Sequence, residues 1–253
     1  MSRNFELLQE VGMGPQSAPP SGLHASSLPE AMSSGDACRN GTPFDLNLHA
    51  RVEYLKLVQR LFLEQTEKTP RVVVFAGIDD GSGSSRICAS VAEVLAAEVR
   101  QSVCVVDANS QSTLWSQLTG GGNHRAVTAD LLQEGSVRDL AQQLQPEKLW
   151  FLACRTLAAD GLLRSDLLRA RFLELRKEFE YVLVDAPPVA LDSTSALLAP
   201  LTDGLVLVVE ANSTRREVAR KVKETLESAH VQLLGAVLNN RTFPIPETIY
   251  RNI

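Results

Sequence analysis

The stretch "GIDDGSGSSR", residues 77–86, has the residue types of a loop that binds phosphate. It follows a run of apolar residues and precedes a helical pattern, so its glycines lie between a buried strand and a helix. Such a turn gathers backbone N–H groups at the positive end of the helix dipole, which favours a bound phosphate. The lysine that usually accompanies such a loop is absent, because Gly83 is followed by Ser84 and Ser85.

Two aspartates follow later apolar runs in the positions of strand ends. Asp107 ends "SVCVVD", and Asp185 ends "YVLVD" just before Ala-Pro-Pro. Both are candidate catalytic residues, although an aspartate in this position can also simply cap the next turn. With Pro187-Pro188 after it and the glycine loop upstream, Asp185 is predicted to coordinate a metal at the carboxyl edge of the sheet.

Strands and helices alternate along most of the chain. Buried strands are predicted at 71–77, 102–108, 149–154, 181–186, 204–211 and 233–240. Helical patterns cover 52–67, 85–99, 166–179 and 213–230, with shorter ones at 128–132 and 137–144. This alternation predicts an α/β fold, a three-layer sandwich with a mostly parallel twisted sheet covered by helices on both sides.

Composition divides the chain into two regions, and the net charge argues against one class of partner. Residues 1–46 are rich in Pro, Ser and Gly and are predicted to be disordered, with a short helix in "MSRNFELLQEVG"; residues 47–253 are predicted to form the folded domain. The net charge of −5 argues against nucleic acid as the partner. No apolar stretch reaches the roughly 18 residues that span a membrane, so we expect a cytoplasmic protein.

A dinucleotide-binding oxidoreductase is a remote alternative. Gly77, Gly81 and Gly83 match the G-x-x-x-G-x-G turn of short-chain dehydrogenases, and Asp107 could then hold a ribose. Such enzymes also need a Tyr-x-x-x-Lys pair. None of the tyrosines has a lysine four residues later.

Several stretches of the chain resemble a second protein family. "FEYVLVDAPPV" (179–189) is very similar to the Walker B strand of the MinD/ParA-type ATPases and of the bacterial tyrosine kinases of capsule and exopolysaccharide synthesis. "VCVVDAN", "PLTDGLVLVVEANST" and "LLGAVLNN" resemble further strands of these kinases, and the likeness covers about Val52 to Arg241. It implies a MinD/ParA-like P-loop NTPase domain over 47–253.

This resemblance also implies the ligands, ATP or ADP with Mg²⁺. The residues implied to bind the nucleotide are Gly81, Ser82, Gly83, Ser84, Ser85, Arg86, Asn239 and Arg241. Asn239 and Arg241 would line the base pocket, although an ordinary turn at the end of a strand explains them equally well. Ser85 and Asp185 would hold the metal.

The chain departs from the kinases at four functional positions. Ser84 stands where the Walker A lysine belongs, and Asn109 replaces the second acid of an Asp-x-Asp pair. A Glu-x-x-Arg-x-x-Arg helix that assembles subunits into rings is represented here by Glu53, Lys56 and Gln59. Their C-terminal tyrosine cluster, the substrate of autophosphorylation, is reduced to Tyr250. These departures predict weak or absent nucleotide binding and lost or impaired phosphotransfer.

The resulting hypothesis is a tyrosine-kinase-like protein with a regulatory or scaffolding role. Its implied partners are a membrane polysaccharide co-polymerase or export component, or an active kinase paralogue, with homo-oligomers as a further option. Docking would place it peripherally at the inner membrane. The alternative is an active ATP-dependent tyrosine kinase or ATPase with an atypical Walker A loop.

Overall fold

The computed structural model describes residues 7–9, 48–64, 69–109, 111–112, 114–119, 130–154 and 165–240. They contain one eight-stranded sheet in the order β1-β8-β7-β2-β6-β3-β5-β4. Its strands are β1 (Leu7–Gln9), β2 (Val72–Gly77), β3 (Val103–Asp107), β4 (Gln142–Gln143), β5 (Leu149–Ala153), β6 (Tyr181–Ala186), β7 (Gly204–Glu210) and β8 (Leu233–Asn239). Every pairing is parallel except that of β4 with β5.

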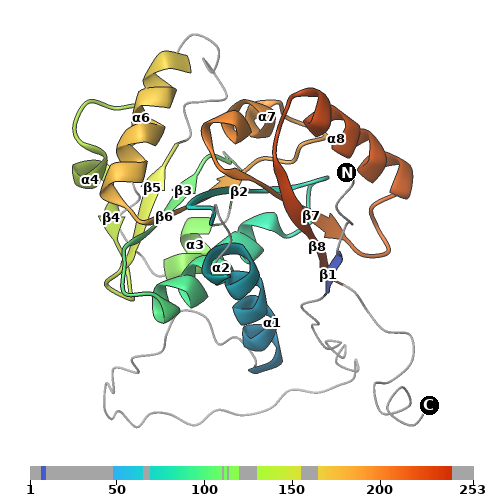
Figure 1. Ribbon diagram of the computed structural model, residues 1–253, viewed down its shortest axis with the longest axis horizontal. Helices are drawn as coiled ribbons and strands as arrows, with labels where there is room; N and C mark the ends of the chain where they lie inside the picture. Colours follow the sequence, from blue (N-terminus) through green and yellow to red (C-terminus); the bar gives the residue numbers. More distant parts are fainter. Residues whose placement is uncertain are drawn as a thin grey trace, which may run out of the picture.

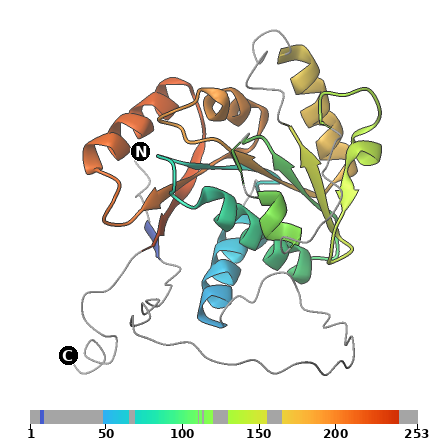
Figure 2. The same ribbon diagram turned by 180° about the vertical axis from the view of Figure 1, so that it is seen from behind.

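Helices cover both faces of this sheet, as Figures 1 and 2 show from opposite sides. One face carries α1 (Leu48–Val58), its π-helical continuation (Gln59–Leu63), α2 (Ser84–Glu98) and α3 (Leu114–Thr119). The other carries α4 (Val137–Leu140), α6 (Ser165–Glu178), α7 (Thr194–Leu198) with a 3₁₀ turn (Ala199–Leu201), and α8 (Arg216–Ser228). The predicted three-layer α/β sandwich is therefore confirmed.

The central strands are buried on both faces because their side chains alternate between two apolar cores. In β2, Val73 and Phe75 pack into the core beneath α1 and α2. Val72 and Val74 pack into the opposite core with Phe172 of α6. Continuous β-branched runs are the sequence that such a sheet requires. This burial fixes the register of the strands and so the relative positions of the residues at their ends.

Three short elements differ from expectation. Leu7–Gln9 is a strand paired with β8, where a short helix was predicted, because the open edge of β8 offers backbone partners that a three-residue segment can use. Residues 130–132 are not helical, since Asp130 forms a bridge with Ala153 at β5. The helix predicted at 137–144 ends at Leu140, where the chain turns to pair β4 with β5.

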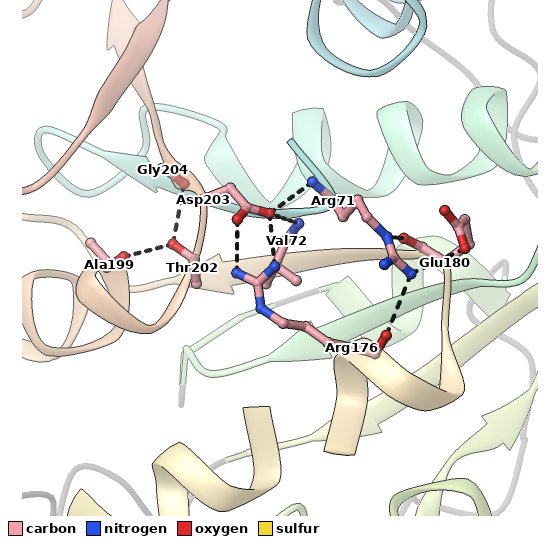
Figure 3. A network of polar contacts seen from close by, with 8 residues as sticks. All are labelled: Arg71, Val72, Arg176, Glu180, Ala199, Thr202, Asp203 and Gly204. Atoms are coloured by element: carbon pink, nitrogen blue, oxygen red, sulfur yellow. Dashed lines mark hydrogen bonds and ion pairs between the residues drawn. The ribbon is translucent and has the colours of Figure 1, made fainter. Parts of the chain in front are cut away.

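The amino-terminal edge of the sheet is held by a network around Asp203 (Figure 3). Its carboxylate accepts hydrogen bonds from the backbone N–H groups of Arg71 and Val72, both at 2.8 Å. The guanidinium of Arg176, at the end of α6, donates to both carboxylate oxygens at 2.9 and 3.1 Å. Arg71 in turn binds Glu180 at 3.0 Å. One carboxylate thus joins β2, α6 and the turn before β7.

This network favours the ionised form of Asp203. Burial opposes ionisation, but Arg176 and the N–H groups of Val72 and Arg71 outweigh it and lower the pKa of Asp203. A carboxyl group whose pKa is lower in the folded state stabilises the fold above its unfolded pKa, and this stabilisation is lost as the pH falls through the folded pKa.

We therefore expect Asp203→Asn to lower the free energy of unfolding by about 2 kcal/mol at pH 7, because the amide cannot accept every bond of the carboxylate. Urea unfolding measures this difference, which should shrink as the pH falls below about 4. Glu178→Gln, at an exposed position on α6, is the control. An equal loss in both variants would show that the network does not stabilise the protein.

Candidate functional site

The loop between β2 and α2 has the backbone shape of a phosphate-binding turn. Gly81 and Gly83 have φ angles of +79° and +82°, in the left-handed region that favours glycine. Gly83 is the N-cap of α2, and its carbonyl accepts the N–H of Ile87 at 3.0 Å. A Cβ at Gly83 would lie 2.3 Å from Nδ2 of Asn239. Both glycines are therefore needed for the turn, and Gly83 is also needed for the close approach of Asn239.

Asn239, at the end of β8, holds this loop in place. Its Nδ2 donates to the backbone carbonyl of Ser82 at 2.8 Å, and both residues are buried. The bond connects positions 157 residues apart and anchors the loop to the last described strand. Asn239 is thus next to the predicted nucleotide loop, while its role at a base stays a prediction. Arg241 lies outside the described residues, and so does Tyr250.

The two predicted catalytic aspartates lie side by side at the carboxyl edge of the sheet. Asp107 and Asp185 are partners in the register of β3 and β6, and both are fully buried. Oδ2 of Asp185 accepts a hydrogen bond from Ser112 Oγ at 2.8 Å. Oδ1 of the same residue is buried and has no hydrogen-bond partner among the described residues. This oxygen is available to a ligand that the protein itself does not supply.

The structure brings the two predicted metal ligands together. Ser85, in the first turn of α2, hydrogen bonds with Asp185 and lies 3.4 Å from Ser112, measured between the two hydroxyl oxygens. No group of three His, Cys, Asp or Glu side chains that could hold a metal exists among the described residues. A cation here would depend on one carboxylate, hydroxyls, water and phosphate oxygens, which suits Mg²⁺. The residues present therefore fit this ion.

Burial makes the charge on Asp185 unfavourable. It raises the pKa of Asp185 to about 7; hydrogen bonds from Ser85 and Ser112 lower it, and the neighbouring Asp107 raises it further. A cation beside the unpaired oxygen would reverse this balance by favouring the carboxylate.

The remaining predicted residues surround the loop. Ser82 and Ser84 are buried, whereas Arg86 is partly exposed on α2. The charge of Arg86 acts on Tyr54 of α1: burial raises the pKa of this phenol, while Ser90 and Arg86 lower it. Asn109 shapes the turn after β3 by donating its backbone N–H to Asp107 Oδ1 at 3.3 Å.

Ser112 is the site residue that the sequence did not indicate. Its hydroxyl accepts the N–H of Leu114 at 2.9 Å, at the start of α3, and donates to Asp185. A serine just before a short helix predicts a helix cap and nothing more. The contact with Asp185 depends on which strands are neighbours, and the spacing along the chain does not contain this information.

The sheet order contradicts the dinucleotide-binding alternative. In that fold the strand with the ribose-binding acid lies directly beside the strand of the glycine loop. Here β6 lies between β2 and β3. Asp107 therefore faces Asp185 across the β3–β6 pair and does not lie on a strand next to the loop strand.

Replacing the buried carboxylate should change how stability depends on pH. Between the ordinary carboxyl pKa of about 4 and the folded pKa of about 7, the folded protein holds a proton that the unfolded chain releases. Wild-type stability should fall as the pH rises through this window.

We expect the free energy of unfolding of Asp185→Asn to exceed that of wild type by about 2–4 kcal/mol at pH 8, with the difference falling as the pH is lowered and almost gone at about pH 4. Urea unfolding across this pH range measures the effect. Asp80→Asn, which removes an exposed carboxylate from the same loop, should follow the wild-type curve. Parallel curves for Asp185→Asn and wild type would contradict the unfavourable burial of this charge.

The chain is similar in sequence to several bacterial tyrosine-protein kinases. It is 23% identical over 190 residues to the tyrosine-protein kinase CpsD of Streptococcus agalactiae, which covers 74% of this chain and 82% of CpsD. It is 24% identical over 191 residues to the tyrosine-protein kinase YwqD of Bacillus subtilis, covering 75% of this chain and 80% of YwqD. No family model matches the sequence.

Solved structures share the fold. The kinase domain of the Escherichia coli tyrosine kinase ETK superposes with a TM-score of 0.66 at 18% identity, over 81% of this chain and 79% of that domain. An ATP complex of a variant of McdA from Cyanothece superposes with a TM-score of 0.51 at 19% identity, over 67% of this chain and 69% of McdA. The chain is therefore a homologue of the bacterial tyrosine-protein kinases, and its domain has the MinD/ParA-like P-loop fold.

Proposed function

We propose that this protein is a regulatory or scaffolding member of the tyrosine kinases of capsule and exopolysaccharide synthesis, with lost or impaired phosphotransfer. One observation supports the proposal most directly. The turn of Gly81 and Gly83 and the contact between Ser85 and Asp185 are built as a nucleotide site requires, while the neutral, buried Ser84 stands at the lysine position. Among the described residues, this arrangement supports a frame for a nucleotide in which a neutral side chain replaces the cation that would stabilise a transferring phosphate.

The loop would bind ATP or ADP through backbone N–H groups at the start of α2, and Ser85 and Asp185 would hold Mg²⁺. When bound, the ion would neutralise charge on the phosphate oxygens. A charge-assisted hydrogen bond to phosphate contributes about 1.5–3 kcal/mol, so its absence weakens nucleotide binding roughly 10- to 100-fold. Phosphoryl transfer depends more strongly on positioned charge, and loss of one donor lowers rates about 100- to 1,000-fold.

Partner binding would then carry the function. Among the described residues no helix is long and apolar enough to cross a membrane. We propose that the protein docks on a membrane polysaccharide co-polymerase or export component, or on an active kinase paralogue, and thereby works at the inner membrane from the cytoplasmic side. Self-association would use α1, where Lys56 binds Glu53 at 2.6 Å and Gln59 begins the π-helical turn.

Restoring the missing charge is the decisive experiment. With radiolabelled ATP and Mg²⁺, we expect wild type to show no phosphate release or tyrosine labelling above background, and Ser84→Lys to gain at least tenfold. The lysine would place its charge beside the phosphates that the loop binds. Gln111→Lys, which adds the same charge at an exposed position near the site, is the matched control.

A third variant, Asp185→Ala, tests whether the protein is instead an active tyrosine kinase. Should wild type label Tyr250, and should Asp185→Ala abolish this labelling, the protein is a working tyrosine kinase with an atypical loop. A small change in Ser84→Lys on top of measurable wild-type turnover would have the same meaning, because another group would already supply the charge.

A further inference from the structure

Three oxygen-bearing side chains from separate segments meet at the carboxyl edge of the sheet. Ser85 comes from α2, Ser112 from the turn before α3, and Asp185 from β6. Ser112 Oγ lies 2.8 Å from Asp185 Oδ2 and 3.4 Å from Ser85 Oγ. Ser85 also hydrogen bonds with Asp185. Each side chain is thus in contact with the other two.

This spacing matches the coordination shell of a small divalent cation. Mg²⁺ binds oxygen at about 2.1 Å in octahedral geometry, which places neighbouring ligands about 3.0 Å apart. The two distances from Ser112, 2.8 and 3.4 Å, lie on either side of this value. Only small shifts would therefore bring Ser112 Oγ to coordination distances from Ser85 Oγ and Asp185 Oδ2.

The hydroxyl of Ser112 is held in position and still has coordinating capacity. It accepts one hydrogen bond, from Leu114 N–H at 2.9 Å, and donates its proton to Asp185 at 2.8 Å, with Ser85 Oγ as a second, longer acceptor at 3.4 Å. A hydroxyl has two lone pairs, so one remains for a cation. The backbone N–H of Ser112 also donates to the carbonyl of Asn109 at 3.0 Å, which fixes the turn.

A second observation points to a ligand at this place. Oδ1 of Asp185 is buried without a hydrogen-bond partner among the described residues, although its sister oxygen is bound by Ser112. Buried carboxylate oxygens without partners are rare in folded proteins and require an explanation. A cation bound to the carboxylate of Asp185 together with the two hydroxyls provides one.

We propose that Ser112 is a third protein ligand of the Mg²⁺ site, acting with Ser85 and Asp185. The proposal rests on the metal site of the proposed function, but it does not depend on whether phosphoryl transfer occurs. The serine takes the place of a water in the shell of the ion. Because Ser112 also binds the first N–H of α3, metal binding would hold the start of α3 against the nucleotide loop.

A cap role alone would explain the bond to Leu114, and it makes a different prediction. If Ser112 only caps α3, its removal lowers stability and leaves metal affinity unchanged. If its hydroxyl instead blocks the site, removal tightens metal binding. If it is a ligand, removal weakens metal binding, and a carboxylate in its place restores it, because affinity for hard cations rises with the number of charged oxygen ligands.

Manganese binding to the full chain separates these cases. Mn²⁺ replaces Mg²⁺, and electron paramagnetic resonance counts the free ion during titration, without nucleotide and with saturating ADP. We expect Ser112→Ala to weaken Mn²⁺ binding about tenfold. Ser112→Asp, which keeps a helix-capping side chain, should bind Mn²⁺ at least as tightly as wild type. Gln111→Ala, at the exposed neighbouring position, should leave the affinity unchanged.

Circular dichroism and urea midpoints of each variant report whether it folds, and the Ser112→Asp result stands even if Ser112→Ala does not fold. Equal or tighter Mn²⁺ binding in Ser112→Ala, weaker binding in Ser112→Asp, or no Mn²⁺ binding by wild type under either condition would overturn the proposal. Phosphotransfer by wild type would contradict the proposed function, but it would not change the expected order of Mn²⁺ affinities among the variants. Failure of the proposed function and failure of the Ser112 proposal are therefore distinguishable.

Discussion

The register of β3 and β6 places two buried carboxylates next to each other, and the whole site is arranged around this constraint. Asp107 and Asp185 cannot move apart, because apolar side chains on both faces of the sheet fix the strands. Their influence extends beneath α2: burial raises the pKa of the Cys88 thiol, and Asp185 and Asp107 raise it further. Buried like charges this close are unfavourable unless opposite charge is nearby. The site is thus suited to a cation.

The carboxylates at the two edges of the sheet differ in how fully their oxygens are hydrogen-bonded. At the amino-terminal edge, Asp203 has its charge satisfied by Arg176 and by two backbone N–H groups, and it joins three elements of the fold. At the carboxyl edge, Asp185 has neutral hydroxyls as partners and one oxygen without any among the described residues. The satisfied carboxylate stabilises the frame, and the carboxylate with an unpartnered oxygen lies at the edge where parallel sheets bind ligands.

The strands and the glycine loop could be predicted from sequence because strong local signals specify them. Continuous β-branched runs demand burial on both faces, and Gly81 and Gly83 supply the left-handed backbone of the turn. The pairing of Asp185 with Ser85 was implied by the resemblance to the P-loop kinases, and it agrees with the rule that strands of a parallel sheet share one carboxyl edge. These inferences needed residue types and spacing along the chain, and no knowledge of the strand order.

Contacts that depend on strand order were out of reach. Ser112 meets Asp185 across 73 positions because β3 and β6 are neighbours, and nothing local to Ser112 indicates this. The network of Asp203 was missed for the same reason, since Arg71, Arg176 and Asp203 are adjacent only once three elements have packed. Leu7–Gln9 was mispredicted for a different reason. A three-residue segment is too short for its pattern of apolar residues to distinguish a helix from a strand, and the open edge of β8 offers it backbone partners.

The bond between Asn239 and the carbonyl of Ser82 has a consequence for the order in which a growing chain matures. The loop near the first third of the protein takes its final support from the end of β8, 157 residues later. Until the ribosome has released β8 and it has paired with β7, the turn lacks this support. The turn therefore gains this support late in synthesis, after every other described strand has been made.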